Sequence, residues 1–240
     1  MTQVEPLPLE QDKIKALLQV STGTLTTVLL KKGLRNVWMR GALPMKEGQP
    51  RVAGRAFTLR FVPAREDLAT PASWGSPIST RAAIEAMPEG CIAVVGAMRV
   101  TDAGIFGDIL CARMQKRGVA ALVTDGVMRD VHGVLGTGLN VWANGWAAPP
   151  SVAGLTFVGW QEPVDCGGVA VFPNDIVVCD QDGAVLIPAA LLDDVIAAAT
   201  EQEHLENWIM SEVEKGAKLP GLYPPNEENW RRYEEWRKKI

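Results

Sequence analysis

Acidic residues and one arginine surround a single apolar segment of this sequence. Asp108 opens the stretch "GDILCARMQKRG", Asp125 follows "GVAALVT", and Arg129-Asp130 come directly afterwards. Two carboxylates that meet can hold a hard divalent cation such as Mg²⁺, directly or through water. An arginine beside them can bind a carboxylate through two parallel hydrogen bonds. These residue types therefore suit a site for a metal ion and a small anion, provided that the fold brings them together.

The elements around these residues predict that they do meet. Residues 91–95 and 119–124 are apolar runs typical of buried strands, and residues 108–117 between them have helical spacing. In such a βαβ unit the helix begins at the sheet edge where both strands end. We therefore expect Asp108 and the 125–130 segment to lie together at the edge where α/β proteins bind ligands. The free N–H groups of Ile109 and Leu110 at the helix start would attract an anion.

Each residue also has a simpler interpretation. Asp108 before an apolar helix can be an N-cap and nothing more. Asp125 with the glycine after it is a turn signal. Arg129 and Asp130 can form an ordinary surface ion pair, and His132 can be a surface residue rather than an active-site member. The sequence leaves both sets of interpretations open.

The rest of the chain predicts an α/β fold with parallel and antiparallel strand pairs. Helices and strands alternate first and strands cluster later, before one long helix and a tail with Trp230, Tyr233 and Trp236 at helical spacing. The predicted helices cover 9–20, 21–33, 80–87, 108–117 and 188–216, and the predicted strands cover 51–63, 91–95, 119–124, 140–144, 156–160, 167–171, 175–180 and 184–188.

Composition excludes several classes of protein. The net charge of −4 gives no basic field for nucleic acid. The N-terminus has no signal-peptide pattern, and no apolar run reaches the ~20 residues that a membrane helix needs. The four cysteines are isolated in apolar surroundings, which indicates buried reduced thiols rather than a zinc site. We expect a soluble cytoplasmic protein with no nucleic-acid or membrane partner.

The core segment resembles a known family, the regulator-of-ribonuclease-activity-A-like (RraA-like) proteins, which include the 4-hydroxy-4-methyl-2-oxoglutarate aldolases. The family signature is an aspartate, twenty residues and then Arg-Asp, and Asp108 with Arg129-Asp130 has that spacing. "VSTGTLTTVLLKKG" and "PNDIVVCDQDGAVLIP" resemble other family segments, although Thr26-Thr27 replace the commoner Asp-Ala and Asn174 replaces a glycine. Asparagine tolerates positive φ better than most residues, so this last change need not disturb the turn.

The resemblance implies a swivelling β/β/α domain with mixed parallel and antiparallel sheets and a C-terminal helical extension. It also implies a homo-trimer or homo-hexamer. We assign residues 1–216 to the RraA-like aldolase domain. Residues 217–240 form a tail and short helix that we expect to dock on the same or a neighbouring subunit.

The resemblance further implies class II pyruvate aldolase chemistry that depends on Mg²⁺ or Mn²⁺. Asp130 would ligate the metal and Asp108 would hold a metal-bound water. Arg129 would bind the 2-keto acid and stabilise the enolate that forms when the carbon–carbon bond breaks. The amides of Ile109 and Leu110 would receive the substrate carboxylate. Oxaloacetate decarboxylation passes through the same enolate and is expected as a second activity.

Two questions stay open under this resemblance. In the aldolases a glutamate from the adjacent protomer completes the site; here the match is Glu206, with Glu203 second, and both can equally be solvent-facing. Trp74 and the segment 142–150 can read the substrate beyond C3 or can be packing residues. The alternative function is a non-catalytic regulator that binds ribonuclease E.

Overall fold

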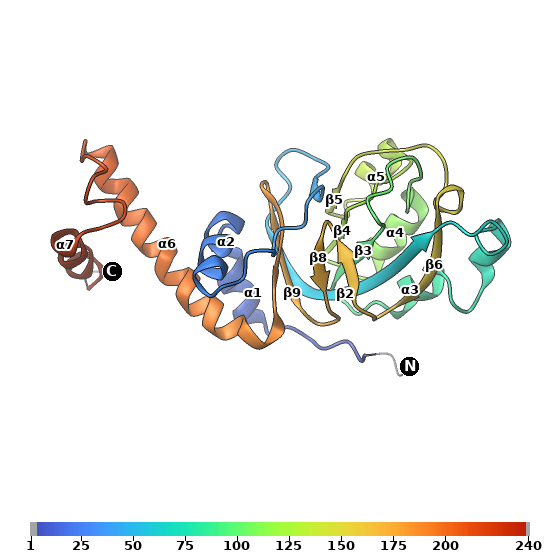
Figure 1. Ribbon diagram of the computed structural model, residues 1–240, viewed down its shortest axis with the longest axis horizontal. Helices are drawn as coiled ribbons and strands as arrows, with labels where there is room; N and C mark the ends of the chain where they lie inside the picture. Colours follow the sequence, from blue (N-terminus) through green and yellow to red (C-terminus); the bar gives the residue numbers. More distant parts are fainter. Residues whose placement is uncertain (1–3, 239–240) are drawn as a thin grey trace.

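The computed structural model describes residues 4–238. A body built around a mixed sheet forms one end of the molecule, and the long helix α6 leads away from it to α7 (Figure 1). The helices are α1 (Gln11–Leu18), α2 (Thr22–Lys31), α3 (Thr80–Ala86), α4 (Asp108–Lys116), α5 (Val131–Gly136), α6 (Leu192–Glu214) and α7 (Glu227–Arg237). The strands are β1 (Leu43–Pro44), β2 (Val52–Pro63), β3 (Ile92–Gly96), β4 (Ala121–Thr124), β5 (Val141–Ala143), β6 (Leu155–Trp160), β7 (Val164–Cys166), β8 (Val169–Val171), β9 (Ile176–Asp180) and β10 (Gly183–Ile187). Three 3₁₀ turns cover Pro71–Gly75, Ser151–Ala153 and Ala189–Leu191.

The long strand β2 joins two parts of the sheet. Its first residues pair antiparallel with β9, and the following residues pair parallel with β3. Its last residues pair antiparallel with β6. The resulting strand order is β1-β5-β4-β3-β2-β9-β10, with β6 also on β2. The predicted mixed α/β architecture is confirmed, including the parallel β3–β4 pair that positions the site.

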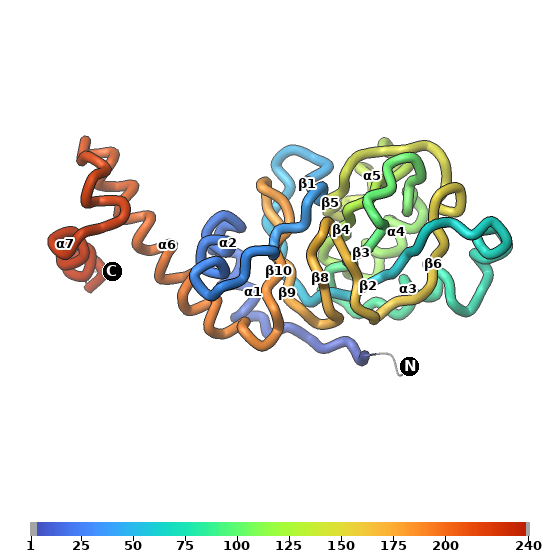
Figure 2. The backbone as a smooth tube through the Cα atoms, in the orientation of Figure 1, coloured from blue at the N-terminus to red at the C-terminus, as the bar shows by residue number. Residues whose placement is uncertain are grey.

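Apolar residues cover the sheet in layers. One core lies between the sheet and α3, α4 and α5, with Phe57, Ile84 and Met114 as examples. A second core on the other face includes Ile92 and residues of the β7–β8 hairpin. Because β3 and β4 are buried on both faces, their sequences are continuous apolar runs rather than alternating ones. A third core packs α1, α2 and the first part of α6 against β9 and β10. Figure 2 shows these helices beside the two strands.

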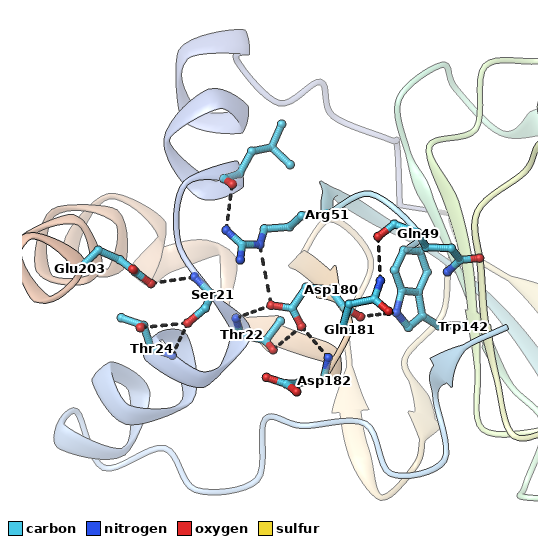
Figure 3. A network of polar contacts seen from close by, with 11 residues as sticks. Ser21, Thr22, Thr24, Gln49, Arg51, Trp142, Asp180, Gln181, Asp182 and Glu203 are labelled. Atoms are coloured by element: carbon cyan, nitrogen blue, oxygen red, sulfur yellow. Dashed lines mark hydrogen bonds and ion pairs between the residues drawn. The ribbon is translucent and has the colours of Figure 1, made fainter. Parts of the chain in front are cut away.

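A buried polar network fixes α2 to the sheet (Figure 3). The Asp180 carboxylate at the end of β9 accepts hydrogen bonds from the Thr22 amide at 2.8 Å and the Thr22 hydroxyl at 2.6 Å. Arg51 Nε lies 3.7 Å from the same carboxylate. The Trp142 indole donates to the Asp180 carbonyl at 2.7 Å. A buried carboxylate needs such partners. The two outer segments that resemble the family, one with Thr22 and one with Asp180, therefore contact each other here and stabilise the fold.

The end of the chain packs on α6. Tyr233 of α7 is buried against Trp208, Leu205 and Ile209 of α6 and against Leu222. The apolar residues Leu205, Trp208 and Ile209 of the long helix are thus covered in part by the tail of the same chain.

Several local predictions differ from the structure. Helix α5 is not among the predicted helices, because six residues that include two glycines give a weak helical signal. The last long helix begins at Leu192 after a 3₁₀ turn rather than at residue 188.

Other local expectations agree with the structure. Asn174 has a φ of 69°, as expected of an asparagine at a glycine position. All four cysteines are free and buried. Within residues 4–238, no helix is long and apolar enough to span a membrane.

Candidate active site

The starts of α4 and α5 bring Asp108 and Asp130 into one cleft. The cleft has a volume of about 350 Å³ and is lined by Asp108, Arg129 and Asp130 together with residues of three loops. Asp108 is the first residue of α4, and Asp130 directly precedes α5. The juxtaposition predicted from the βαβ topology is therefore present, since both segments follow the carboxyl ends of parallel strands.

Three glycines allow this close approach. A methyl group on Gly133 would lie 2.5 Å from Asp108 Oδ2, and one on Gly107 would overlap Asp130 Oδ2. A methyl group on Gly104 would lie 2.7 Å from Arg129 Cβ. Sequence reasoning missed these glycines as site residues. The sequence signal that could have identified them is a glycine within a few residues of each aspartate, in "GIFGD" and in "RDVHG".

Arg129 and Asp130 form an ion pair inside this cleft. Arg129 Nε donates to Asp130 Oδ2 at 3.1 Å, and the two side chains are 33% and 43% exposed. The Arg129 amide donates to the Phe106 carbonyl at 2.9 Å. Asp130 has a φ of 55°, in the left-handed region that aspartate tolerates better than most residues. The ion-pair interpretation is correct for the contact, but the pair faces a cleft rather than a flat surface.

The start of α4 differs in detail from the expectation. The N-cap residue is Gly107, so the interpretation of Asp108 as the N-cap was wrong by one position. Asp108 Oδ1 instead accepts the Ile109 amide at 2.7 Å. That amide is therefore not free for an anion in this structure, while the Leu110 amide has no acceptor among residues 4–238. The positive end of the helix dipole still faces the cleft.

The acidic pair fits a hard cation that keeps part of its water shell. Each carboxylate has one oxygen bound to a protein donor, Asp108 Oδ1 and Asp130 Oδ2, and a second oxygen without one in the described part of the chain. Within residues 4–238 no cluster of three or more His, Cys, Asp or Glu residues is present. Two carboxylate oxygens are enough for an ion such as Mg²⁺, which usually retains several waters. Any further ligands must come from water, substrate or another chain.

Comparison with known proteins identifies the family of this chain. The family model for RraA-like proteins, described as Aldolase/RraA, matches residues 13–186. This chain belongs to the RraA-like family. It is 26% identical over 212 residues to the uncharacterized protein MJ0644 of Methanocaldococcus jannaschii, covering 86% of this chain and 97% of that one. It is 28% identical over 124 residues to a putative 4-hydroxy-4-methyl-2-oxoglutarate aldolase of Halalkalibacterium halodurans, covering 51% of this chain and 58% of that one.

A solved structure shares the fold of this RraA-like chain. Streptomyces coelicolor RraAS2, described as an unusual member of the RNase ES inhibitor RraA protein family, superposes with a TM-score of 0.75 at 30% identity. The match covers 84% of this chain and 97% of RraAS2.

The two candidate glutamates of this RraA-like chain lie on α6, at the far end of the body from α4 (Figure 1). Glu203 Oε1 accepts the Ser21 amide at 2.8 Å (Figure 3). Glu206 accepts Gln202 Nε2 at 2.7 Å and lies 3.4 Å from the Thr24 hydroxyl. Within one chain neither glutamate reaches Asp108, so their contribution to a shared site stays a prediction.

The structure shows the surroundings of three other residues that the sequence singled out. Asp125 is more than a turn residue, because its buried carboxylate accepts the amides of Ala97 at 2.8 Å and Gly167 at 3.1 Å. Burial raises the pKa of this carboxyl group, whereas the two hydrogen bonds oppose the rise. His132 is exposed on α5 and does not line the cleft. Trp142 is fully buried, so it is a core residue rather than a substrate contact.

The remaining wall of the cleft comes from α3 and two loops. Trp74 lines it, in agreement with the prediction of a substrate-facing position rather than with that of a packing residue. Thr80, Arg81, Pro150 and Ser151 line it as well. The guanidinium of Arg81 lies over the Trp74 ring, 4.8 Å from its centroid. Sequence reasoning missed Arg81, because nothing near it in the sequence marks the helix start as facing the acidic pair.

Proposed function

We propose that this protein is a divalent-metal-dependent carbon–carbon lyase. It cleaves 4-hydroxy-4-methyl-2-oxoglutarate or a related 2-keto acid to release pyruvate, and it decarboxylates oxaloacetate as a side activity. The observation that carries the proposal is the cleft that Asp108 and Asp130 line together with Arg129. The printed names of the relatives from Halalkalibacterium halodurans and Bacillus cereus, both putative 4-hydroxy-4-methyl-2-oxoglutarate aldolases, support the reaction class.

The two aspartates hold Mg²⁺ or Mn²⁺ in this proposal, Asp130 directly and Asp108 through water. When bound, the ion supplies Lewis-acid polarisation of the 2-keto group. Arg129 orients the keto acid through its planar guanidinium and stabilises the negative charge that develops on the keto oxygen as the bond breaks. The Leu110 amide at the positive end of α4 receives the substrate carboxylate, and the Ile109 amide joins it when Asp108 turns away.

The composition of the cleft supports a metal-based electron sink. Cleavage beside a 2-keto group needs a place for the electron pair, and enzymes supply either a lysine Schiff base or a metal. The residues that line the cleft include no lysine. The lysine in the core motif, Lys116, is the exposed last residue of α4, at the opposite end of that helix from Asp108.

We also propose that the protein works as a homo-trimer or homo-hexamer in which a neighbouring chain completes the cleft with Glu206 or Glu203. The acidic pair alone leaves most metal ligand positions to other groups. Both glutamates lie on the helix that leads away from the body (Figure 1), where a second copy can meet them.

Coupled detection of pyruvate tests the proposal. The purified protein should release pyruvate from 4-hydroxy-4-methyl-2-oxoglutarate and from oxaloacetate with Mg²⁺ or Mn²⁺ and should lose this activity on exhaustive chelation. Asp130→Ala should raise the metal concentration needed for activity, and excess metal should rescue it in part. Activity that survives chelation would remove the metal from the mechanism.

The alternative is a regulator that binds ribonuclease E without catalysis. The likeness to RraAS2 over almost the whole length of that protein favours it. This alternative predicts no turnover of any 2-keto acid and direct capture of ribonuclease E by the purified protein. An intact set of Asp108, Arg129 and Asp130 in one cleft favours the enzyme.

A further inference from the structure

The cleft contains a second guanidinium besides that of Arg129. Arg81 on α3 lines it together with Asp108, Ile109 and Leu110 at the start of α4. Its guanidinium carbon lies over the Trp74 ring, 4.8 Å from the ring centroid, and Nη1 donates to the Thr80 hydroxyl at 3.3 Å. These two contacts restrict the orientation of the guanidinium, which lowers the cost of ordering it when it binds an anion.

Arg81 has no acidic partner within residues 4–238. The other arginines near it do: Arg129 pairs with Asp130, and Arg113 and Arg117 both pair with Glu85. Partial burial lowers the pKa of Arg81, which reflects the loss of water around its charge. A partly desolvated cation without a counter-ion is unfavourable, and an anion from solution that reaches it gains both charge and hydrogen bonds.

We propose that Arg81 binds a second carboxylate of the substrate, on the part of the molecule beyond C3. The planar fork of the guanidinium matches a carboxylate, while Arg129 and the start of α4 are occupied by the pyruvyl end. This inference rests on the proposed function and adds a specificity to it. The protein selects 2-keto acids with a distal carboxylate over 2-keto monoacids, and Arg81 is the residue that makes the distinction.

Binding of two unreactive ligands tests this role without any turnover. Calorimetry in Mg²⁺ buffer should compare 2-oxoglutarate with 2-oxopentanoate, which has the same number of carbons but no distal carboxylate. The wild type should bind 2-oxoglutarate ~10- to 100-fold more tightly, the range expected of hydrogen bonds to a charged group. Arg81→Gln should abolish this preference and leave 2-oxopentanoate binding within about twofold. Arg81→Lys keeps the charge without the fork and should recover part of the preference.

Arg113→Gln is the matched control. It removes one positive charge from α4, close to α3, but Arg113 pairs with Glu85 and does not line the cleft. The preference for 2-oxoglutarate should survive in this variant. If Arg113→Gln loses this preference as well, the preference comes from the overall electrostatic potential of the protein rather than from Arg81, and the subsite is refuted.

The remaining outcomes separate this inference from the proposed function. Equal weakening of both ligands by Arg81→Gln would assign Arg81 a packing role against Trp74 and overturn the inference. A wild type that shows no preference, or that binds neither ligand, overturns it too. If the wild type binds 2-oxoglutarate selectively through Arg81 but releases no pyruvate from any 2-keto acid, the subsite stands and the proposed function fails. With an active enzyme, Arg81→Gln should raise KM for dicarboxylate substrates and leave kcat nearly unchanged.

Discussion

Replacing Gly133 by alanine tests whether the position of Asp108 matters for activity. The new methyl group would lie 2.5 Å from Asp108 Oδ2, 2.6 Å from Asp108 Cβ and 3.0 Å from Asp108 Cγ. Comfortable contacts between non-bonded heavy atoms begin at about 3.5 Å. Because Asp108 Cβ is attached to the backbone of α4, a side-chain rotation cannot relieve the overlap. The starts of α4 and α5 must therefore separate by about 1 Å.

The overlap allows the losses of stability and of rate in Gly133→Ala to be worked out. Overpacking costs about 1–3 kcal/mol, and alanine in place of a helical glycine returns about 1 kcal/mol. The net loss of about 0–2 kcal/mol lowers the melting temperature by at most roughly 8 °C in a chain of this length, so the protein stays folded. A displacement of about 1 Å at a catalytic group costs about 10²-fold in rate. Thermal unfolding and coupled pyruvate detection in Mg²⁺ measure the two effects separately.

Gly136→Ala provides the control in the same helix. Nothing lies within 4 Å of a methyl group at Gly136, and its backbone is not in the positive-φ region. This variant should keep wild-type activity and be as stable as the wild type or slightly more stable. A folded Gly133→Ala protein with wild-type kcat and unchanged metal dependence would refute the reasoning, because Asp108 would then be free to move without consequence.

Three further predictions concern Arg129, Asp125 and Glu206. Arg129→Lys should fold normally and lose ~10²-fold or more in rate, the scale of one preorganised electrostatic donor; a rate close to wild type would leave Arg129 as an ion-pair partner only. Asp125→Ala strands the buried amides of Ala97 and Gly167 and should lower the free energy of unfolding by about 2–4 kcal/mol in a denaturant titration; an unchanged midpoint would show that water replaces the carboxylate. Inactive Arg129→Lys and Glu206→Ala oligomers, each shown to be correctly assembled, should regain partial activity when they are unfolded together and reassembled. The absence of recovery despite demonstrated subunit exchange would confine the catalytic groups to one chain.

The sequence was sufficient to predict where Asp108 and Asp130 meet. Strands that are buried on both faces leave continuous apolar runs, and a helix between two such runs has one way to return to the sheet. That rule places the start of α4 beside the end of β4 whatever the side chains are. The same periodicity predicted β2, β9, β10 and most of α6, because these elements are long and strongly patterned.

The walls of the cleft were beyond sequence reasoning for a physical reason. Arg81 lines the cleft beside Trp74, which lies on the 3₁₀ turn Pro71–Gly75, and α3 packs against both that turn and β6. Residue spacing does not encode these contacts between segments. The Asp108 carboxylate can accept a hydrogen bond either from water or from the Ile109 amide, and residue spacing does not determine which of the two it accepts. The Asp125 carboxylate accepts from amides 28 and 42 residues away along the chain, so only the folded structure reveals its donors.

The surroundings of the cleft explain why a second chain matters to the proposed chemistry. Ile109 of α4 and Val131 and Leu135 of α5 are 80%, 43% and 40% exposed. Asp108 is half-buried and Asp130 is exposed, so bulk water reaches both carboxylates and screens the electrostatic stabilisation that the reaction needs. A neighbouring copy that covers these side chains would exclude that water and supply the missing acidic ligand together. If the proposed oligomer forms, its dissociation should lower both activity and metal affinity, because both effects follow from uncovering the same cleft.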